Sequence, residues 1–189
     1  ILSSEGRGWA LEDNRNETKG YKKEKLEQQK ESVDRILRAA GIDVTKNPVK
    51  IILGGDLIAA SGVGASAASC AAIARALSDH FNLGFSDEKI NELAYEGEKA
   101  YHGSPSGIDN TAATYGGLLW FRKGQPDIIE RLKLNKPVEI VMGNTGIVTN
   151  TKAAVEGVKK RRENDPEKYK RIFREAEEKQ VRQLKLRRA

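Results

Sequence analysis

Apolar residues recur at helical spacing in one segment near the start of the chain. In residues 22–40 they fall at Leu26, Val33, Ile36 and Leu37, so that one side of a helix would be apolar and the rest charged. A glycine follows the last of these positions, as is common after the end of a helix. The pattern predicts an amphipathic helix over residues 22–40.

The middle of the chain combines short apolar runs with two longer helical patterns. Residues 49–55 (VKIILGG) predict a buried strand that two glycines end, and residues 56–64 predict a second short strand that runs into a glycine loop. Residues 65–81 are rich in alanine and serine and predict a helix of small residues. Residues 86–103 begin with a serine N-cap and acids in the first turn, which predicts another helix.

The remaining segments complete an irregular order of elements. Residues 1–20 predict a loop with room for a short strand at its start, and a short helix and a glycine break come before a strand over 117–123. Residues 137–146 predict a strand with a turn, and helices are expected over 149–164 and 165–189. Strands and helices alternate without the regular rhythm of a doubly wound sheet, so the fold class expected is α+β.

Composition narrows where the core can lie. Apolar residues make up 38% of the chain and charged residues 32%, so the core must be concentrated, and most apolar runs fall in residues 49–121 and 138–158. The net charge of +6 belongs to the tail: residues 152–189 hold 14 Lys and Arg against 7 Asp and Glu. Acids interrupt that tail as they do on an ordinary solvated helix, so we expect no nucleic-acid partner.

Two further features bear on compartment. No run approaches the ~18 apolar residues that span a bilayer, so no membrane association is expected. The one cysteine, Cys70, lies in a small-residue helix and is interpreted as a packed residue, and without an internal disulfide the chain suits a reducing compartment. Cytoplasm is the default expectation, with an organelle left open.

The glycine loop is the first candidate for chemistry. In "SGVGASAAS" (61–69), Gly62 and Gly64 precede a helix that opens around Ser66. Glycines allow close approach of a ligand, and a helix N-terminus offers unpaired N–H groups and partial positive charge, which together suit a phosphate. The hydroxyl of Ser66 could bind Mg²⁺ on that phosphate. A tight turn before a closely packed helix is the alternative.

The stretch "GSPSGIDN" (103–110) is the second candidate. Pro105 fixes one backbone angle, and the glycines permit angles that other residues avoid, so the segment is a poor helix and a poor strand. Such a rigid turn can hold Asp109 in one place. We interpret Asp109 as a candidate catalytic carboxylate.

Three stretches in this order carry a family resemblance: "GGDLIAASGVGASAAS", "EGEKAYHGSPSGIDNTAATYGGLLWF" and "GNTGIVTNTKAAV". With them the chain resembles the GHMP kinases and, within that superfamily, the mevalonate kinase family in its protist-like form. The resemblance runs from about residue 13 to about residue 175. It implies a GHMP kinase-like fold (ribosomal protein S5 domain 2-like), with a partial ATP-binding N-terminal domain over 1–150 and the start of a helical C-terminal domain over 151–189.

The resemblance also implies roles for individual residues. Ser66 and Glu98 would coordinate Mg²⁺ between the nucleotide phosphates, Asp109 would face the attacking hydroxyl of mevalonate, and Thr151 would lie near the transferred phosphoryl group or the substrate. Without the resemblance, Glu98 would read as part of a solvated, acid-rich helix face. The backbone that would cradle the phosphates of ATP comprises Gly62, Val63, Gly64, Ala65, Ser66 and Ala67.

Two motifs of the family pattern are expected outside this chain. One is an N-terminal strand whose lysine pairs with the catalytic aspartate, and the other is a late glycine-rich motif that closes over the phosphates. We therefore expect a parent kinase of isoprenoid and sterol synthesis and little turnover by these 189 residues alone. The alternatives are another GHMP small-molecule kinase, acting on phosphomevalonate or a sugar, and a non-catalytic binding fragment. A homodimer is left open.

Overall fold

The chain forms two compact units, Ile1–Val148 and Thr149–Ala189. The computed structural model describes residues 2–3, 8–59, 62–133, 136–137, 139–143 and 151–188. Within them no helix is long and apolar enough to cross a membrane. The hydrophobic core lies in the first unit.

A small mixed sheet forms one side of the first unit. Strand β3 (Val49–Leu53) lies between β1 (Leu2–Ser3), which is antiparallel to it, and β2 (Trp9–Asp13), which is parallel to it. The expected strand over 49–55 is confirmed. The prediction of a loop is wrong for β2. Its alternation of Trp9 and Leu11 is only five residues long and follows a glycine, so the sequence pattern for a strand is weak.

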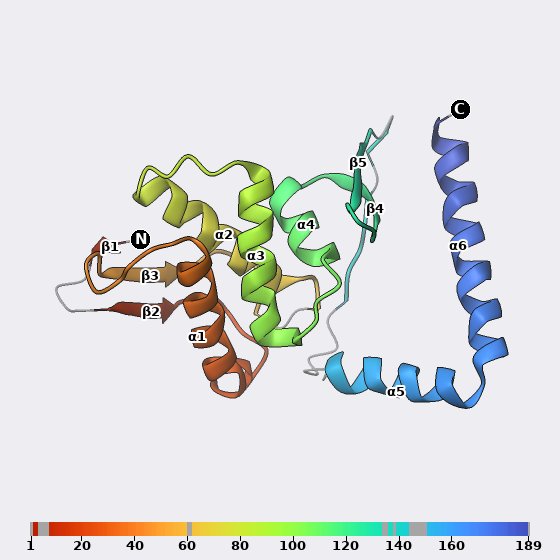
Figure 1. Cartoon of the computed structure of the whole chain (residues 1–189), viewed down its shortest axis with the longest axis horizontal. Coiled ribbons are helices and arrows are strands. Elements are labelled where there is room, and N and C mark those ends of the chain that lie inside the picture. Colours follow the sequence, from red (N-terminus) through yellow and green to blue (C-terminus); the bar gives the residue numbers. More distant parts are fainter. Residues whose placement is uncertain are drawn as a thin grey trace. The chain divides into compact units, whose positions relative to one another are not determined.

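Three helices pack around the core of this unit (Figure 1). They are α1 (Tyr21–Ala39), α2 (Ala65–His80) and α3 (Asp87–His102), and all three were predicted from periodicity and caps. Helix α3 packs against both α1 and α2. The largest apolar side chains that are almost fully buried come from these helices and β3: Val33, Ile36, Val49, Ile51, Cys70, Leu77, Ile90 and Leu93.

Helix α4 (Ile108–Tyr115) packs on α2 and α3 and leads into a hairpin of β4 (Leu118–Arg122) and β5 (Ile128–Leu132). The strand over 117–123 is confirmed, whereas β5 was not predicted. The strand expected over 56–64 is wrong in its described part: only Ala59 bridges, to Glu17. Glycines and exposed side chains on both sides of Ala59 leave no continuous run to pair.

The strand expected over 137–146 is also absent from its described residues, 139–143, which form no regular element.

The second unit consists of α5 (Thr151–Asn164) and α6 (Pro166–Arg188), as the helical patterns predict. At the start of α6 the Asp165 carboxylate accepts a hydrogen bond from the Lys168 backbone N–H, so Asp165 caps a helix whose first residue is proline.

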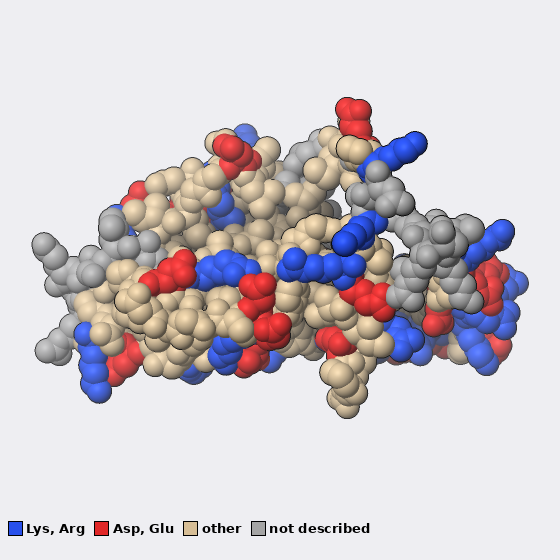
Figure 2. Space-filling model, turned by 90° about the horizontal axis from the view of Figure 1, so that it is seen from above, with Lys and Arg blue, Asp and Glu red and all other residues tan. Residues whose placement is uncertain are grey.

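Charged groups of both signs are mixed over the face shown in Figure 2. On α1, for example, Lys30 pairs with Glu27 at 2.9 Å and Arg35 with Glu31 at 2.7 Å. Such spaced pairs are typical of a solvated helix surface.

Candidate active site

The N-terminus of α2 is open to an anion. Gly62 and Gly64 have positive φ angles of 77° and 74°, and Gly64 occupies the N-cap without a side-chain hydrogen bond. The first turn of α2 contains no acidic residue. Because the first N–H groups of a helix have no acceptor within it, this turn presents free donors and partial positive charge. The expected glycine loop is therefore formed as a loop that leads directly into a helix.

Glu98 lies on α3 behind this turn, and it is buried. Only 2% of its surface is exposed, and its Oε1 atom has no hydrogen-bond partner among the described residues. The Ser66 hydroxyl lies close enough to the Glu98 carboxylate to lower the pKa of that carboxyl. The interpretation of Glu98 as a solvated surface residue is excluded by this burial.

Burial raises the pKa of Glu98 above its ordinary value, and the negative charge of Asp109 raises it further, whereas the Ser66 hydroxyl and His102 act in the opposite direction. A buried carboxylate with an unpartnered oxygen is costly unless a cation or a donor reaches it. The oxygen atoms of Glu98 and Ser66 therefore suit a cation that binds oxygen ligands.

Asp109 lies in the first turn of α4, not in a turn that excludes helix as the sequence predicted. Gly107, at the N-cap with φ 90°, starts this helix, and Asp109 is its second residue. A Cβ placed on Gly64 would lie 3.8 Å from the Cβ of Asp109. The Asp109 side chain thus lies against the glycine loop, close enough to Glu98 for its charge to affect the Glu98 pKa.

Hydrogen bonds to α3 hold the chain in place on both sides of Asp109. The Tyr95 hydroxyl donates to the Pro105 carbonyl at 3.3 Å, and the buried Asn110 donates to the Asn91 side-chain oxygen at 2.6 Å. Gly107 has a φ of 90°, which residues with a side chain rarely adopt, so the glycine is required by its backbone angle. The flexible end of Lys123 lies 3.3 Å from the position of its missing Cβ.

The structure brings together Ser66, Glu98 and Asp109 with the loop at 62–67, from three separate helices. Thr151 begins α5, and its side chain lies outside what the structure describes. His102 is a residue of the site that the sequence did not indicate: its Nε2 lies 3.6 Å from Glu98 Oε2. The four-residue spacing of Glu98 and His102 on one helix was the available signal.

Magnesium fits this arrangement better than a metal that needs many protein ligands. Among the described residues no group of three or more His, Cys, Asp and Glu side chains could hold a metal ion. Mg²⁺ is commonly bound by one or two protein oxygens together with waters and phosphate oxygens. The Ser66 hydroxyl and the unpartnered Glu98 Oε1 provide such a pair of oxygens.

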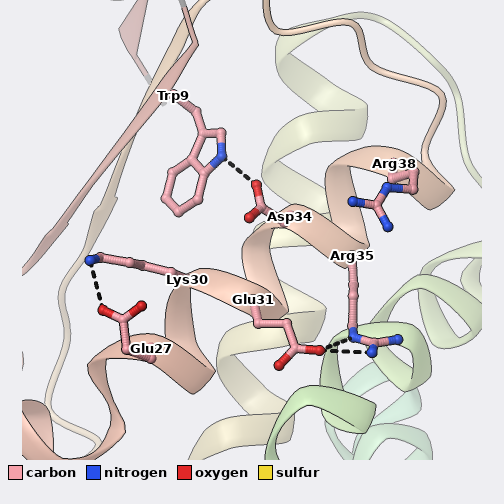
Figure 3. Close-up of a pocket in the computed structure, with 7 residues that line it drawn as sticks. All are labelled: Trp9, Glu27, Lys30, Glu31, Asp34, Arg35 and Arg38. Carbon is pink, nitrogen blue, oxygen red and sulfur yellow. Dashed lines mark hydrogen bonds and ion pairs between the residues drawn. The ribbon is translucent and has the colours of Figure 1, made fainter.

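A different hollow of about 510 Å³ lies over α1 and β2 (Figure 3). Its charged side chains are mostly paired with one another, and the Trp9 indole N–H donates to Asp34 at 2.6 Å. The lining holds three basic and three acidic side chains, so this hollow carries no net charge that would favour an anion. The residues that line it are Trp9, Glu27, Lys30, Glu31, Asp34, Arg35 and Arg38.

Residues 29–117 match the model of the GHMP kinases N terminal domain. The chain is 38% identical over 143 residues to mevalonate kinase of Arabidopsis thaliana, a match that covers 67% of this chain and 36% of that protein. It is 41% identical over 80 residues to mevalonate kinase of Homo sapiens, covering 42% of this chain and 19% of that protein.

Two solved structures resemble the fold. The structure of L. major mevalonate kinase in complex with R-mevalonate matches 90% of this chain and 53% of that chain, with a TM-score of 0.78 and 32% identity. Homoserine kinase from Cytophaga hutchinsonii matches 68% of this chain and 40% of that chain, with a TM-score of 0.52 and 25% identity. The chain therefore spans about half of the first structure and about a third of the Arabidopsis relative.

Proposed function

We propose that the parent protein of this chain is a GHMP kinase that transfers the γ-phosphoryl group of ATP to the primary hydroxyl of mevalonate, as the match of residues 29–117 to the GHMP kinases N terminal domain supports. The observation that carries the proposal is the proximity of three groups: the α2 N-terminus, the half-buried Ser66 beside the buried Glu98, and Asp109. The likeness to mevalonate kinases of several organisms supports mevalonate as the acceptor.

In this proposal the loop from Gly62 to Ala67 binds the nucleotide phosphates through backbone N–H groups. Ser66 and Glu98 would hold Mg²⁺, which supplies positive charge to the phosphates as the transferred group loosens. The buried Glu98 explains why this pair would prefer a cation: the charge of the metal would offset the cost of an ionised carboxylate out of water.

Asp109 acts on the acceptor. Its carboxylate accepts a hydrogen bond from the mevalonate hydroxyl and so orients the oxygen in line with the γ-phosphorus. A bond forms between that oxygen and phosphorus while the bond from phosphorus to the ADP oxygen breaks, and the hydroxyl proton passes to Asp109. The products are ADP and 5-phosphomevalonate. Asp109 suits this role because it is exposed next to the glycine loop.

The proposal includes a limit on the chain itself. The chain covers 19% to 53% of the relatives cited above, and we propose that it binds the nucleotide but turns over little substrate alone. The same proposal for the parent protein includes four further points: Thr151 lies near the substrate, the protein forms a homodimer, it is located in the cytoplasm, and it acts in isoprenoid and sterol synthesis.

The test is phosphorylation by the parent protein, measured as ADP release that depends on mevalonate. Asp109→Asn should lower kcat at least a hundredfold while the KM for ATP changes little, because the amide cannot accept the proton. Asp79→Asn, which alters an exposed acid at the far end of α2, serves as the matched control. Equal kcat for Asp109→Asn and the unaltered protein would remove Asp109 from the reaction.

A panel of acceptors separates the second candidate function. The likeness to homoserine kinase makes another GHMP small-molecule kinase the alternative. Turnover with mevalonate but not with homoserine, phosphomevalonate or galactose supports the leading proposal. Faster turnover with any of the other three would replace mevalonate as substrate and leave the nucleotide site intact.

A further inference from the structure

A buried ion pair lies behind the candidate nucleotide site. Asp13 and Arg15, at the end of β2, each expose only 8% of their side chain. Arg15 donates to both carboxylate oxygens, from Nε to Oδ1 at 2.9 Å and from Nη2 to Oδ2 at 2.6 Å. Gln29 of α1 also donates to Oδ2 at 2.9 Å. Two parallel hydrogen bonds of this kind fix the guanidinium in one plane.

The ion pair is connected to α2 by a short chain of hydrogen bonds. The remaining terminal nitrogen of Arg15, Nη1, donates to the Ser69 hydroxyl at 2.5 Å. That hydroxyl in turn donates to the Ala65 carbonyl at 2.8 Å. Burying two charges is costly, so a buried ion pair is weak evidence for a gain in stability. This ion pair also directs the hydrogen bond from Arg15 to Ser69, which gives it a second role.

The end of this chain lies at the site itself. The Ala65 carbonyl and the Ser66 N–H belong to the same peptide group, which is planar. Fixing the direction of the carbonyl therefore fixes the direction of the N–H, one of the free donors in the first turn of α2. A donor that polarises the carbonyl also strengthens the N–H as a donor, because hydrogen bonds in a chain reinforce one another.

Residues 13–18, which include the ion pair, are hydrogen-bonded to β3 and to the segment between β3 and the glycine loop. Asn14 N–H donates to the Leu53 carbonyl at 2.9 Å, and Thr18 N–H donates to the Ala59 carbonyl at 3.0 Å. The Lys22 ammonium donates to the carbonyls of Asp13 and Arg15, at 2.8 Å and 2.5 Å. Residues 13–18 are thus fixed on both sides, which gives Arg15 a rigid base.

We propose that Arg15, oriented by Asp13, is a positioning residue for the nucleotide site and acts through Ser69 to fix the Ala65–Ser66 peptide that faces the phosphates. The inference rests on the proposed function, because it assigns a purpose to a nucleotide at the α2 N-terminus. The inference adds Asp13, Arg15 and Ser69 to the site, and these residues lie outside the glycine loop and are not the proposed metal ligands Ser66 and Glu98. Arg15 itself does not contact the ligand.

The test is the affinity of the chain for Mg-ATP, measured by calorimetry or by amide shifts in NMR titrations. Ser69→Ala removes the connecting hydroxyl and leaves the ion pair intact. It should raise the Kd for Mg-ATP about five- to tenfold, the effect expected from one aligned donor. Ser69→Thr keeps a hydroxyl and should restore most of the affinity.

Ser78→Ala is the matched control, since Ser78 is on the same helix and its hydroxyl accepts a hydrogen bond from the Phe85 N–H. It should lower the thermal midpoint without changing the Kd for Mg-ATP. A merely structural role for Ser69 predicts the same behaviour for both variants. Equal Kd values for Ser69→Ala and the unaltered chain, or equal losses for both serine variants, would overturn the inference.

A double-variant cycle with Arg15→Met tests whether Arg15 acts through Ser69. If it does, Arg15→Met weakens Mg-ATP binding in the unaltered chain but adds less than twofold in the Ser69→Ala background. Losses that multiply independently would overturn the inference. Arg15→Met leaves Asp13 buried without its partner, so Arg15→Lys, which retains the charge but not the planar fork, serves if the first variant does not fold.

Two failures can be told apart in these experiments. If the unaltered chain shows no saturable binding of Mg-ATP, the nucleotide site of the proposed function fails and this inference fails with it. If the unaltered chain binds and the Ser69 and Arg15 variants bind equally well, only the positioning role fails. Loss of affinity in Ser69→Ala, restored in Ser69→Thr and absent in Ser78→Ala, supports both.

Discussion

Two buried carboxylates, Asp13 and Glu98, are held in opposite ways at the scale of single residues. Burial alone would raise the pKa of Asp13, but hydrogen bonds from Arg15 and Gln29 and the charge of Arg15 outweigh it and lower that pKa to about 2. Burial raises the pKa of Glu98, and no lysine or arginine pairs with it among the described residues. Asp13 is therefore satisfied within the protein, whereas Glu98 is left for a ligand.

Glu98→Gln should separate stability from binding. The amide is neutral and similar in shape, so losing the buried charge should leave the folded state as stable or stabilise it by about 1 kcal/mol. Binding of Mg-ATP should weaken at least tenfold, because a neutral amide oxygen is a poorer partner for Mg²⁺. Urea unfolding and calorimetry measure the two effects.

Glu96→Gln is the control for that variant, since Glu96 lies on the same helix and pairs with Lys99 near the surface. It should leave Mg-ATP affinity unchanged. A Glu98→Gln chain that binds Mg-ATP as tightly as the unaltered chain would rule out Glu98 as a metal ligand.

Asp13 makes a prediction about acid. A carboxyl group whose pKa is lowered in the folded state stabilises the protein fully above its unfolded pKa of about 3.8 and loses this effect as the pH falls toward 2. The loss from Asp13 should be about 2 kcal/mol between pH 5 and pH 2. Urea unfolding at a series of pH values measures it.

Asp13→Asn is the informative comparison. The variant should be less stable at neutral pH, and the difference from the unaltered chain should shrink as the pH falls and Asp13 itself becomes protonated. A constant difference from pH 5 to pH 2 would show that Asp13 does not titrate with folding.

At the scale of elements, close packing of α3 against α1 and α2 sets the position of Glu98. Gly97 allows this approach: a Cβ there would lie 2.8 Å from both Cys70 Sγ and Ile36 Cδ1. The neighbouring residue on α3 is Glu98, so a shift of this helix would move the carboxylate relative to Ser66.

Gly97→Ala should destabilise the protein by about 1–2 kcal/mol, because overpacking costs more than the gain in helix propensity. Combining it with Ile36→Val, which removes the opposing Cδ1 methyl group, should recover part of the loss. Thermal unfolding measures both. Gly157→Ala, opposed only by the flexible end of Arg161, should be neutral or stabilising, and an equal loss there would remove packing as the reason.

At the scale of elements, the sequence predicted the long helices but not every short strand. The helices over 22–40, 65–81 and 86–103 were predictable because long periodic patterns, serine and glycine boundaries and small residues all agreed. Strands β2 (WALED) and β5 (IIERL) were missed because charged residues interrupt their short apolar patterns. The start of α4 was missed because Gly107 serves as its N-cap.

At the scale of the whole molecule, the core and the candidate site occupy the first unit, whereas the excess of basic residues lies in the tail. Spacing alone did not bring Ser66, Glu98 and Asp109 together; only the family resemblance implied a shared site. The Asp13–Arg15–Ser69 connection was not predictable at all, because it joins a strand end to a helix far along the chain. Tertiary packing creates such contacts, and no local pattern encodes them.

The most direct measurement is paramagnetic broadening of amide NMR signals by ATP loaded with Mn²⁺ in place of Mg²⁺, with Mg-ATP as the diamagnetic reference. The account predicts that signals from residues 62–69, Glu98 and Asp109 broaden together, that those lining the hollow over α1 do not, and that Glu98→Gln reduces the effect. Broadening centred on α1, or broadening that reaches only one of the three groups, would contradict the claim that they form one nucleotide site.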